Sequence, residues 1–306
     1  MELRLKVEGK DGRNMSEFYF STVGRFLNSS TGYEEAEYVF FGAPFDGTST
    51  YRPGSRFFPS SVREASVNIE GYSFRHNYDV EKAKIHDAGD LFVSNNAGEV
   101  VESVRKACFN ILKDKKKIIM VGGEHTVTLG ASRALSMDVG LLILDAHFDV
   151  RPEYMGSTIG HASVLRRIIE ERGADKIVHL GVRAACEEEI AFVRKCGLKY
   201  LGSRAFMEKG QAVFKEVERE LTRLDKVYVS LDMDVFDPSY APGVGNPEPE
   251  GLSPTTMFGV LNRLEGRCVL GFDVTEGTPL LPDCGVTSIL AAKTIFELVS
   301  ASQKSS

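Results

Sequence analysis

Leu141-Leu-Ile-Leu-Asp-Ala-His-Phe-Asp149 decides the fold class of this chain, because a short apolar run leads directly into three polar side chains. The stretch Val227-Tyr-Val-Ser-Leu-Asp-Met-Asp234 repeats this arrangement. Short apolar runs of this kind are typical of buried parallel strands. Open α/β proteins carry their functional groups at the carboxyl ends of such strands. Both stretches therefore predict a site at one edge of a parallel sheet.

The rest of the chain alternates between the same two patterns. Strands are expected at residues 38–41, 117–121, 141–144, 176–180, 227–231 and 267–272. Apolar residues recur at three and four positions, as in amphipathic helices, over residues 99–113, 162–172, 187–195, 211–224 and 287–299. This alternation predicts an α/β fold with three layers (α/β/α) and a mainly parallel central sheet.

The chain has 306 residues, which suits a single domain with one large core. Residues 1–32 are polar and weakly periodic, so we expect an N-terminal arm there, exposed or poorly ordered. No linker rich in Pro, Gly or Ser divides the remainder. Residues 33–306 are therefore expected to form one catalytic domain.

Composition excludes several classes of protein. The net charge of −6 and the pI of about 5.7 argue against binding to nucleic acid or to a membrane surface, which both require a basic footprint. No apolar stretch is long enough to span a bilayer, and the N-terminus lacks the core of a signal peptide. The five cysteines show no CxxC spacing. These features predict a cytoplasmic protein, and its charge suits a small cationic substrate.

The polar residues after the two central strands form a set of metal ligands. Asp145, His147 and Asp149 lie two residues apart, so an extended backbone turns them to one side, and Asp232 and Asp234 follow the same rule. The turn Gly122-Gly-Glu-His125 adds a second imidazole after another strand.

A single Asp at a strand end is usually a cap, but four buried carboxylates together would repel one another without cations. Their four negative charges balance two divalent ions. Carboxylate-rich ligation with fewer imidazoles favours manganese over zinc, so two Mn²⁺ per subunit are predicted, although affinity order alone leaves cobalt, nickel and zinc open.

With these residues in place, the chain resembles the ureohydrolase family, the arginases and agmatinases, which hydrolyse guanidino compounds to urea and an amine. The resemblance runs from about residue 41 to 299 and implies the arginase/deacetylase-like fold. It is carried by the turn that ends at His125, by the stretch from Asp145 to Asp149, by His161, by residues 230–243 and by Asp273-Val-Thr-Glu276.

The resemblance also implies roles for individual residues. One ion would be held by His125, Asp145, Asp149 and Asp232, and the other by Asp145, His147, Asp232 and Asp234. A hydroxide bridging the two ions would attack the guanidinium carbon. Glu276 would bind and orient the guanidinium, and His161 would carry a proton to the departing amine.

Within the family the chain is most like the agmatinases. The carriers are Gly42-Ala-Pro-Phe-Asp46, residues 51–56 and 62–66, and the loop Asn246-Pro-Glu-Pro-Glu-Gly-Leu252. The predicted activity is hydrolysis of agmatine to putrescine and urea, and Glu153 is a candidate for binding the distal ammonium. Arginase and guanidinobutyrase activities stay open, because Asn246 and Glu250 differ from the usual agmatinase residues.

Three other classes of protein account for these residues less well. A deacetylase on the related fold would use one zinc ion in an Asp-His-Asp site, and that leaves His125, Asp145 and Asp234 unexplained. A non-catalytic protein held together by divalent ions would not need His161 and Glu276. A nicotinamide enzyme is excluded, because Gly122-Gly-Glu-His125 lacks the G-x-G-x-x-G series. The family resemblance further implies a homo-oligomer, a trimer or hexamer.

Overall fold

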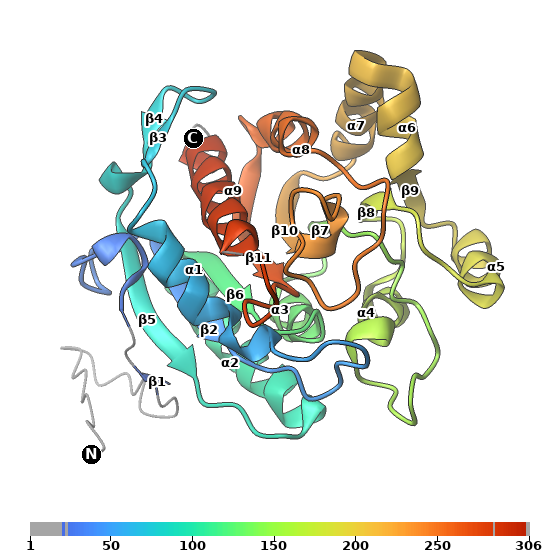
Figure 1. Ribbon diagram of the computed structural model, residues 1–306, viewed down its shortest axis with the longest axis horizontal. Helices are drawn as coiled ribbons and strands as arrows, with labels where there is room; N and C mark the ends of the chain where they lie inside the picture. The colour runs from blue at the N-terminus through green and yellow to red at the C-terminus, as the bar shows by residue number, and fades with distance from the viewer. Residues whose placement is uncertain (1–19, 22–23, 284, 304–306) are drawn as a thin grey trace.

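A computed structural model describes residues 20–21, 24–283 and 285–303. Its centre is a sheet with the strand order β1-β5-β2-β6-β11-β10-β7-β8-β9 (Figure 1). Every neighbouring pair is parallel except β1 with β5. The strands are β1 Phe20–Ser21, β2 Tyr38–Ala43, β5 Ile85–Leu91, β6 Lys117–Gly122, β7 Val139–Leu144, β8 Ile177–Val182, β9 Lys199–Gly202, β10 Lys226–Asp232 and β11 Cys268–Thr275. A separate small hairpin pairs β3 Tyr72–Ser73 with β4 Tyr78–Asp79.

Helices cover both faces of the sheet. One layer contains α1 Phe58–Ser66, α6 Ser203–Lys209, α7 Val213–Leu221, α8 Pro254–Leu261 and α9 Val286–Gln303, which contact one another in the series α1, α9, α8, α7, α6. The other layer contains α2 Ala97–Lys113, α3 Val127–Ala134, α4 Val164–Arg172 and α5 Glu187–Cys196. The predicted three-layer architecture with a mainly parallel sheet is therefore confirmed.

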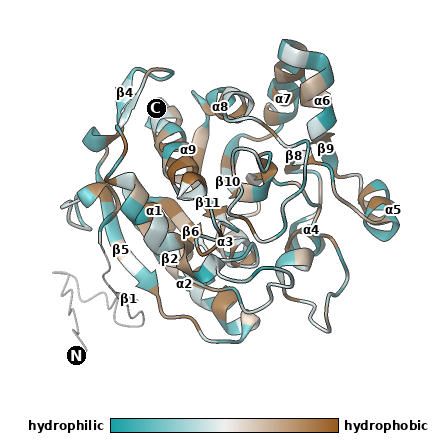
Figure 2. Ribbon diagram, in the orientation of Figure 1, coloured by the Kyte–Doolittle hydropathy of each residue, from teal (hydrophilic) through white to brown (hydrophobic). Residues whose placement is uncertain are grey.

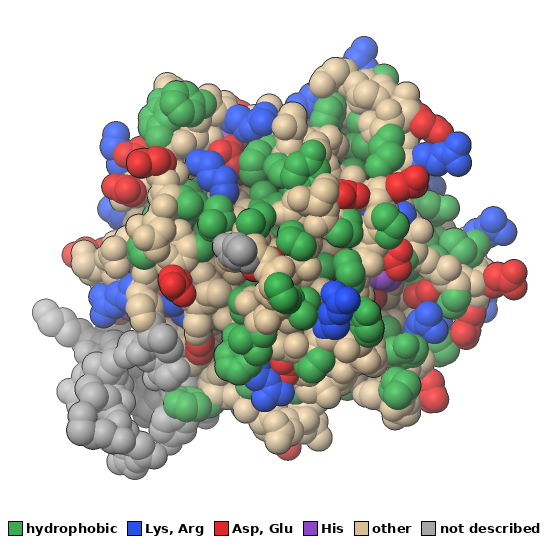
Figure 3. All heavy atoms as spheres, viewed as in Figure 1, with side chains coloured by type: hydrophobic (Ala, Val, Ile, Leu, Met, Phe, Trp, Pro, Cys, Tyr) green, Lys and Arg blue, Asp and Glu red, His purple; other side chains and the backbone are tan. Residues whose placement is uncertain are grey.

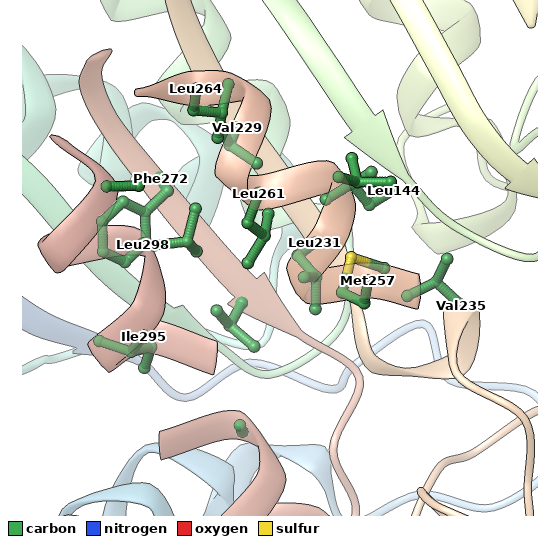
Figure 4. Packing of buried hydrophobic residues seen from close by; sticks show 14 of the residues in the cluster. Leu144, Val229, Leu231, Val235, Met257, Leu261, Leu264, Phe272, Ile295 and Leu298 are labelled. Carbon is green, nitrogen blue, oxygen red and sulfur yellow. The ribbon is translucent and has the colours of Figure 1, made fainter. Parts of the chain in front are cut away.

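The central strands β2, β6, β7, β8, β10 and β11 are mainly apolar because both of their faces are covered (Figure 2). In Figure 4, side chains of β10 and β11 meet those of α8 and α9 in a continuous apolar layer. Leu231, Met257, Phe272 and Ile295 in this layer are fully buried. This packing fixes β10 and β11 rigidly, and it therefore fixes the residues that follow them.

All six strands expected from the sequence are present, as are the five expected helices, with ends that differ by a few residues. The helix expected at 162–172 begins as a short 3-10 turn, His161–Ser163, and becomes α-helical at Val164. The prediction missed the longer strand β5, the short strands β1, β3, β4 and β9, and the helices α1, α3, α6 and α8.

An N-terminal arm is expected at residues 1–32, and the structure describes residues 20–21 and 24–32 of it. Residues 1–19, 22 and 23 lie outside the described residues. β1 pairs with the outer strand β5. Phe26 is fully buried and stacks on Phe40, with a ring-centroid distance of 4.6 Å. Among the described residues, no helix has the length and apolar character that crossing a membrane requires.

The strand order places four neighbouring carboxyl ends at the middle of one sheet edge. They belong to β6, β11, β10 and β7. On the face shown in Figure 3, acidic and basic side chains are interspersed, so no single-sign patch is visible there.

Candidate metal centre and active site

Each of the four central strands delivers a candidate residue at its carboxyl end or within three residues of it. His125 follows β6, Asp145 follows β7, Asp232 is the last residue of β10, and Glu276 follows β11. The turn after β6 needs Gly123, because a Cβ at this position would lie 2.0 Å from the carbonyl oxygen of Phe45. The parallel arrangement thus brings together residues that are up to about half the chain apart in sequence.

Within the described residues, His125, Asp145 and Asp149 form one group whose ligand atoms all lie within 4.8 Å of one another. Nδ1 of His125 is 3.1 Å from Oδ2 of Asp145 and 3.1 Å from Oδ2 of Asp149. All three residues are buried. Asp149 has a positive φ of 53°, which is uncommon for a residue with a side chain and suits a functional constraint.

Asp145, His147 and Asp234 form a second group within the same distance limit, so Asp145 belongs to both. Nδ1 of His147 lies 2.8 Å from Oδ2 of Asp234 and 3.8 Å from Oδ1 of Asp145. Asp232 lies beside both groups. Its Oδ2 is 3.6 Å from Nδ1 of His125, and its Oδ1 accepts a hydrogen bond of 2.8 Å from the backbone of Asp234. The structure therefore brings all six predicted ligands together.

The electrostatics of the cluster reflect crowded like charges. Burial and the charge of Asp145 raise the pKa of Asp149 to about 7. Burial and the charge of Asp234 raise the pKa of Asp232 well above its ordinary value. Burial alone would lower the pKa of His147, but the charge and hydrogen bond of Asp234 raise it to about 10. The crowded carboxylates of the cluster thus favour the binding of positive charge, either protons or cations.

The donor set fits divalent cations. Oδ2 of Asp145 is buried without a hydrogen-bond donor of good geometry, so it is free to bind an ion. Nε2 of His125 lies 3.0 Å from Oγ of Ser230, whose hydroxyl donates to Asp273 over 2.6 Å. Ser230 therefore accepts from Nε2, and this leaves Nδ1 of His125 as the lone-pair atom facing the carboxylates. Sequence reasoning missed this Ser230–Asp273 support, although both residues lie in the quoted motifs.

Glu276 lies beside the ligands and is buried. Its Oε1 accepts a hydrogen bond of 2.7 Å from the backbone N–H of His125, and its own N–H donates to the carbonyl of Gly123. Its φ of 66° places the residue in the left-handed region. Burial and the charge of Glu124 raise the pKa of Glu276 well above its ordinary value. A strained, buried carboxyl of this kind is typical of a residue that awaits a cation.

His161 begins the 3-10 turn before α4 and is almost fully buried. Oγ1 of Thr48 lies 3.3 Å from its Nδ1, and Oγ1 of Thr50 lies 3.3 Å from its Nε2. The ring of Tyr154 packs edge-on against it, with centroids 6.0 Å apart. Burial, helped by the charge of His147, lowers the pKa of His161 to about 4, so the ring is neutral at pH 7.

Glu153 is exposed, on the loop between Asp149 and His161. The acidic side chain that approaches the ligands from the rim is instead Glu248, whose Oε1 lies 3.9 Å from Nε2 of His147. Glu248 lies in the stretch 246–252, which is one carrier of the sequence resemblance. That position was the one sequence feature from which Glu248 could have been predicted as a site residue.

Arg183, which follows β8, connects the rim loop, residues 246–252, to the ligand segment, residues 232–234. It donates to the backbone carbonyls of Asp234 over 2.7 Å, of Glu248 over 2.7 Å and of Pro249 over 2.8 Å. The guanidinium thus bridges the residues after β10 and the loop that bears Glu248.

Comparison with known protein families gives a match over nearly all of the chain. A model of the arginase family matches residues 36–300. An agmatinase from Pyrococcus horikoshii is 35% identical over 280 residues, which cover 89% of this chain and 94% of that protein. An N(1)-aminopropylagmatine ureohydrolase from Thermococcus kodakarensis is 33% identical over 281 residues, with coverages of 89% and 92%.

Solved structures agree with the sequence comparison. The crystal structure of agmatine ureohydrolase from Thermoplasma volcanium superposes with a TM-score of 0.87 and 39% identity, covering 93% of this chain and 96% of that one.

Proposed function

The chain belongs to the arginase family, and on that premise we propose that it hydrolyses the guanidino group of agmatine to putrescine and urea with two Mn²⁺ per subunit. The observation that carries the proposal is the pair of donor groups that share Asp145 and lie beside the buried carboxyl of Glu276. A deacetylase-like site with one zinc ion would leave His125, Asp145 and Asp234, which belong to these groups, without a role.

Each of the two donor groups would hold one ion. His125 and Asp149 would hold one ion and His147 and Asp234 the other, with Asp145 and Asp232 between them. Oxygen-rich donors with two imidazoles favour manganese. Two bound divalent ions lower the pKa of water and so supply a nucleophile at neutral pH.

Glu276 would hold the substrate. A carboxylate pairs with the planar N–H groups of a guanidinium in a charge-assisted contact, and the hydrogen bond from the His125 backbone fixes one of its two oxygens. The arriving cation would lower the raised pKa of Glu276 and so stabilise its ionised form.

His161 would move the proton. A neutral imidazole can accept a proton released from water and give it to the departing amine, which cannot leave as an anion. Its burial next to Tyr154 keeps bulk water from the proton while it is transferred.

The tail of agmatine ends in an ammonium, which an acidic side chain near the ligands could bind. Glu248 faces the site from its rim, and Glu153 lies on a neighbouring loop. We propose that one or both of them select a substrate with a distal cation over arginine, whose α-carboxylate they would repel.

The test is urea release from agmatine, N(1)-aminopropylagmatine, arginine and guanidinobutyrate, with metal analysis of the same sample. We expect agmatine to give the highest kcat/KM and about two Mn²⁺ per chain. N(1)-aminopropylagmatine is the second candidate, because a relative with 33% identity is named for it. Urea release from none of the four by the manganese-loaded protein would contradict the proposal.

We also propose that the protein works in the cytoplasm as a homo-oligomer, a trimer or hexamer, as its family resemblance implies. Light scattering of the metal-loaded protein measures the subunit number directly.

A further inference from the structure

A buried carboxylate outside the predicted ligand set is linked to His161. Glu124, in the turn after β6, is fully buried. Its Oε2 accepts from the backbone N–H of Thr48 over 2.7 Å, and its Oε1 accepts from the hydroxyls of Thr48 and Thr126 over 2.5 Å each. Burial raises the pKa of this carboxyl, and the bonds from Thr126 and Thr48 act against that rise. Glu124 therefore clamps Thr48 by both its backbone and its side chain.

The other side of Thr48 faces His161. Oγ1 of Thr48 accepts from the backbone N–H of His161 over 3.2 Å and lies 3.3 Å from its ring Nδ1. Gly160 leaves room for this approach, since a Cβ there would lie 3.0 Å from the same oxygen.

The donors and acceptors of this chain of contacts can be counted. A hydroxyl has one proton to donate and two lone pairs to accept with. The Thr48 proton goes to the Glu124 carboxylate, which is the shorter contact and cannot donate when ionised. Oγ1 of Thr48 can then only accept, both from the backbone of His161 and from Nδ1. The proton on the neutral His161 ring consequently belongs on Nδ1.

The second ring nitrogen has a different neighbour. Oγ1 of Thr50 lies 3.3 Å from Nε2 of His161, and Thr50 is exposed. Its hydroxyl is free to rotate, so it can donate to Nε2 when that atom carries a lone pair and accept from it when it carries a proton.

We propose that Glu124, acting through Thr48, fixes His161 in the Nδ1–H tautomer, so that Nε2 is the atom that takes up and releases the proton. Glu124 and Thr48 are positioning residues in this scheme, because neither touches the reacting atoms. The role assigned to His161 rests on the proposed function, whereas the tautomer itself does not.

The test uses a spectroscopic readout and a rescue. Protein with ¹⁵N-labelled histidine is loaded with Zn²⁺, which is diamagnetic, and the ring signals of His161 are identified by their loss in His161→Asn. Wild-type protein should show a protonated Nδ1 and an unprotonated Nε2. Thr48→Val removes the hydroxyl at nearly constant shape and should move the ring toward the Nε2–H tautomer, whereas Thr48→Ser should restore the wild-type signals.

Kinetics with Mn²⁺ provide the second readout. Thr48→Val and Glu124→Gln should lower kcat for urea release by about tenfold or more with little change in KM, as loss of a correctly oriented proton carrier does. Thr126→Val is the matched control, because it removes another hydrogen bond from the same Glu124 oxygen but leaves Thr48 in place. It should keep the wild-type tautomer.

The outcomes separate the two ideas. If Thr48→Val keeps the Nδ1–H signals, the inference is overturned whatever the activity. If wild-type protein shows the expected tautomer but releases urea from no guanidino substrate, the proposed function fails and the tautomer assignment stands. Should Thr48→Val not fold, Glu124→Gln and Thr48→Ser give the same comparison.

Discussion

Asp145 is the residue at which the two donor groups meet, so its loss should differ from the loss of a ligand that serves one group. Asp145→Asn keeps the size of the side chain but removes its charge. We expect this variant to lose tight binding of both ions, whereas Asp149→Asn should keep one. Metal analysis after gel filtration checks this. Equal metal contents in the two variants would show that Asp145 is not shared.

Glu276 should affect turnover and not the metal content. Glu276→Gln keeps the hydrogen bond from the His125 backbone but loses the charge that faces the guanidinium. We expect urea release to fall by at least about 10²-fold, since a charge aimed at a cationic reactant is removed from a buried site. The manganese content should stay at the wild-type value, and a drop in metal content would mean that Glu276 supports the ligands instead.

His161 should also make the free energy of unfolding depend on pH. Its folded pKa of about 4 lies below its ordinary value of 6.5, chiefly because of burial. Between these values the unfolded chain binds the proton and the folded chain does not, so the free energy of unfolding falls as the pH drops from 6.5 toward 4.

The pH slope of His161→Asn should therefore be shallower than that of wild type across this window. Differential scanning calorimetry of both metal-free proteins measures the difference. It avoids guanidinium and urea, which resemble the proposed substrate and product. Parallel curves for the two proteins would contradict the low pKa.

At the scale of residues, the sequence predicted site residues where a motif fixes the spacing between them. Five of the six ligands lie at two-residue spacing at or after strand ends, and the structure places all six within reach of one another. The Thr48–Glu124–His161 chain was not predictable, because it joins segments 76 and 113 residues apart through single hydrogen bonds. No periodicity or charge pattern encodes such a contact.

At the scale of elements, Arg183 links the end of β8 to the ligand segment and the rim loop. Arg183→Lys keeps the charge but cannot reach these separated carbonyls with one ammonium. We expect a loss of about 1–3 kcal/mol in the free energy of unfolding, because partly buried carbonyls lose hydrogen bonds from a charged donor. KM for agmatine should rise as the loop that bears Glu248 loosens. Thermal unfolding and steady-state kinetics measure the two effects.

The matched control is Arg204→Lys. Arg204 pairs with Glu208 on an exposed helix surface, where an ion pair contributes little to stability. The same substitution should therefore change little there. If the two variants behaved alike, the bridging role of Arg183 would be wrong.

The missed elements have a common physical reason. β5 contains His86, Asp87 and Asp90, which do not read as a buried strand, yet Arg63 of α1 pairs with both aspartates in the core. β9 has only four residues and lies at the edge of the sheet. Tertiary pairing, and not local preference, decides such segments.

For the whole molecule, metal uptake should release protons. The pKa of Asp149 is raised to about 7 and that of His147 to about 10, so both carry protons that an incoming ion must displace. Affinity for Mn²⁺ should therefore increase as the pH rises through 7. Calorimetric titration with Mn²⁺ in buffers of different ionisation enthalpy counts the released protons. A pH-independent affinity would argue against these assignments.

The position of β11 has a consequence for biosynthesis. β11 is the last strand of the chain, yet it lies in the middle of the sheet, between β6 and β10. Among the described strands, the half that contains β5, β2 and β6 pairs with the half that contains β10, β7, β8 and β9 only through β11. On the ribosome the sheet thus cannot become continuous across the two halves until residue 275 has emerged from the exit tunnel. Because the ligands come from both halves, only a completed polypeptide can acquire both ions, and C-terminally truncated products should remain metal-free.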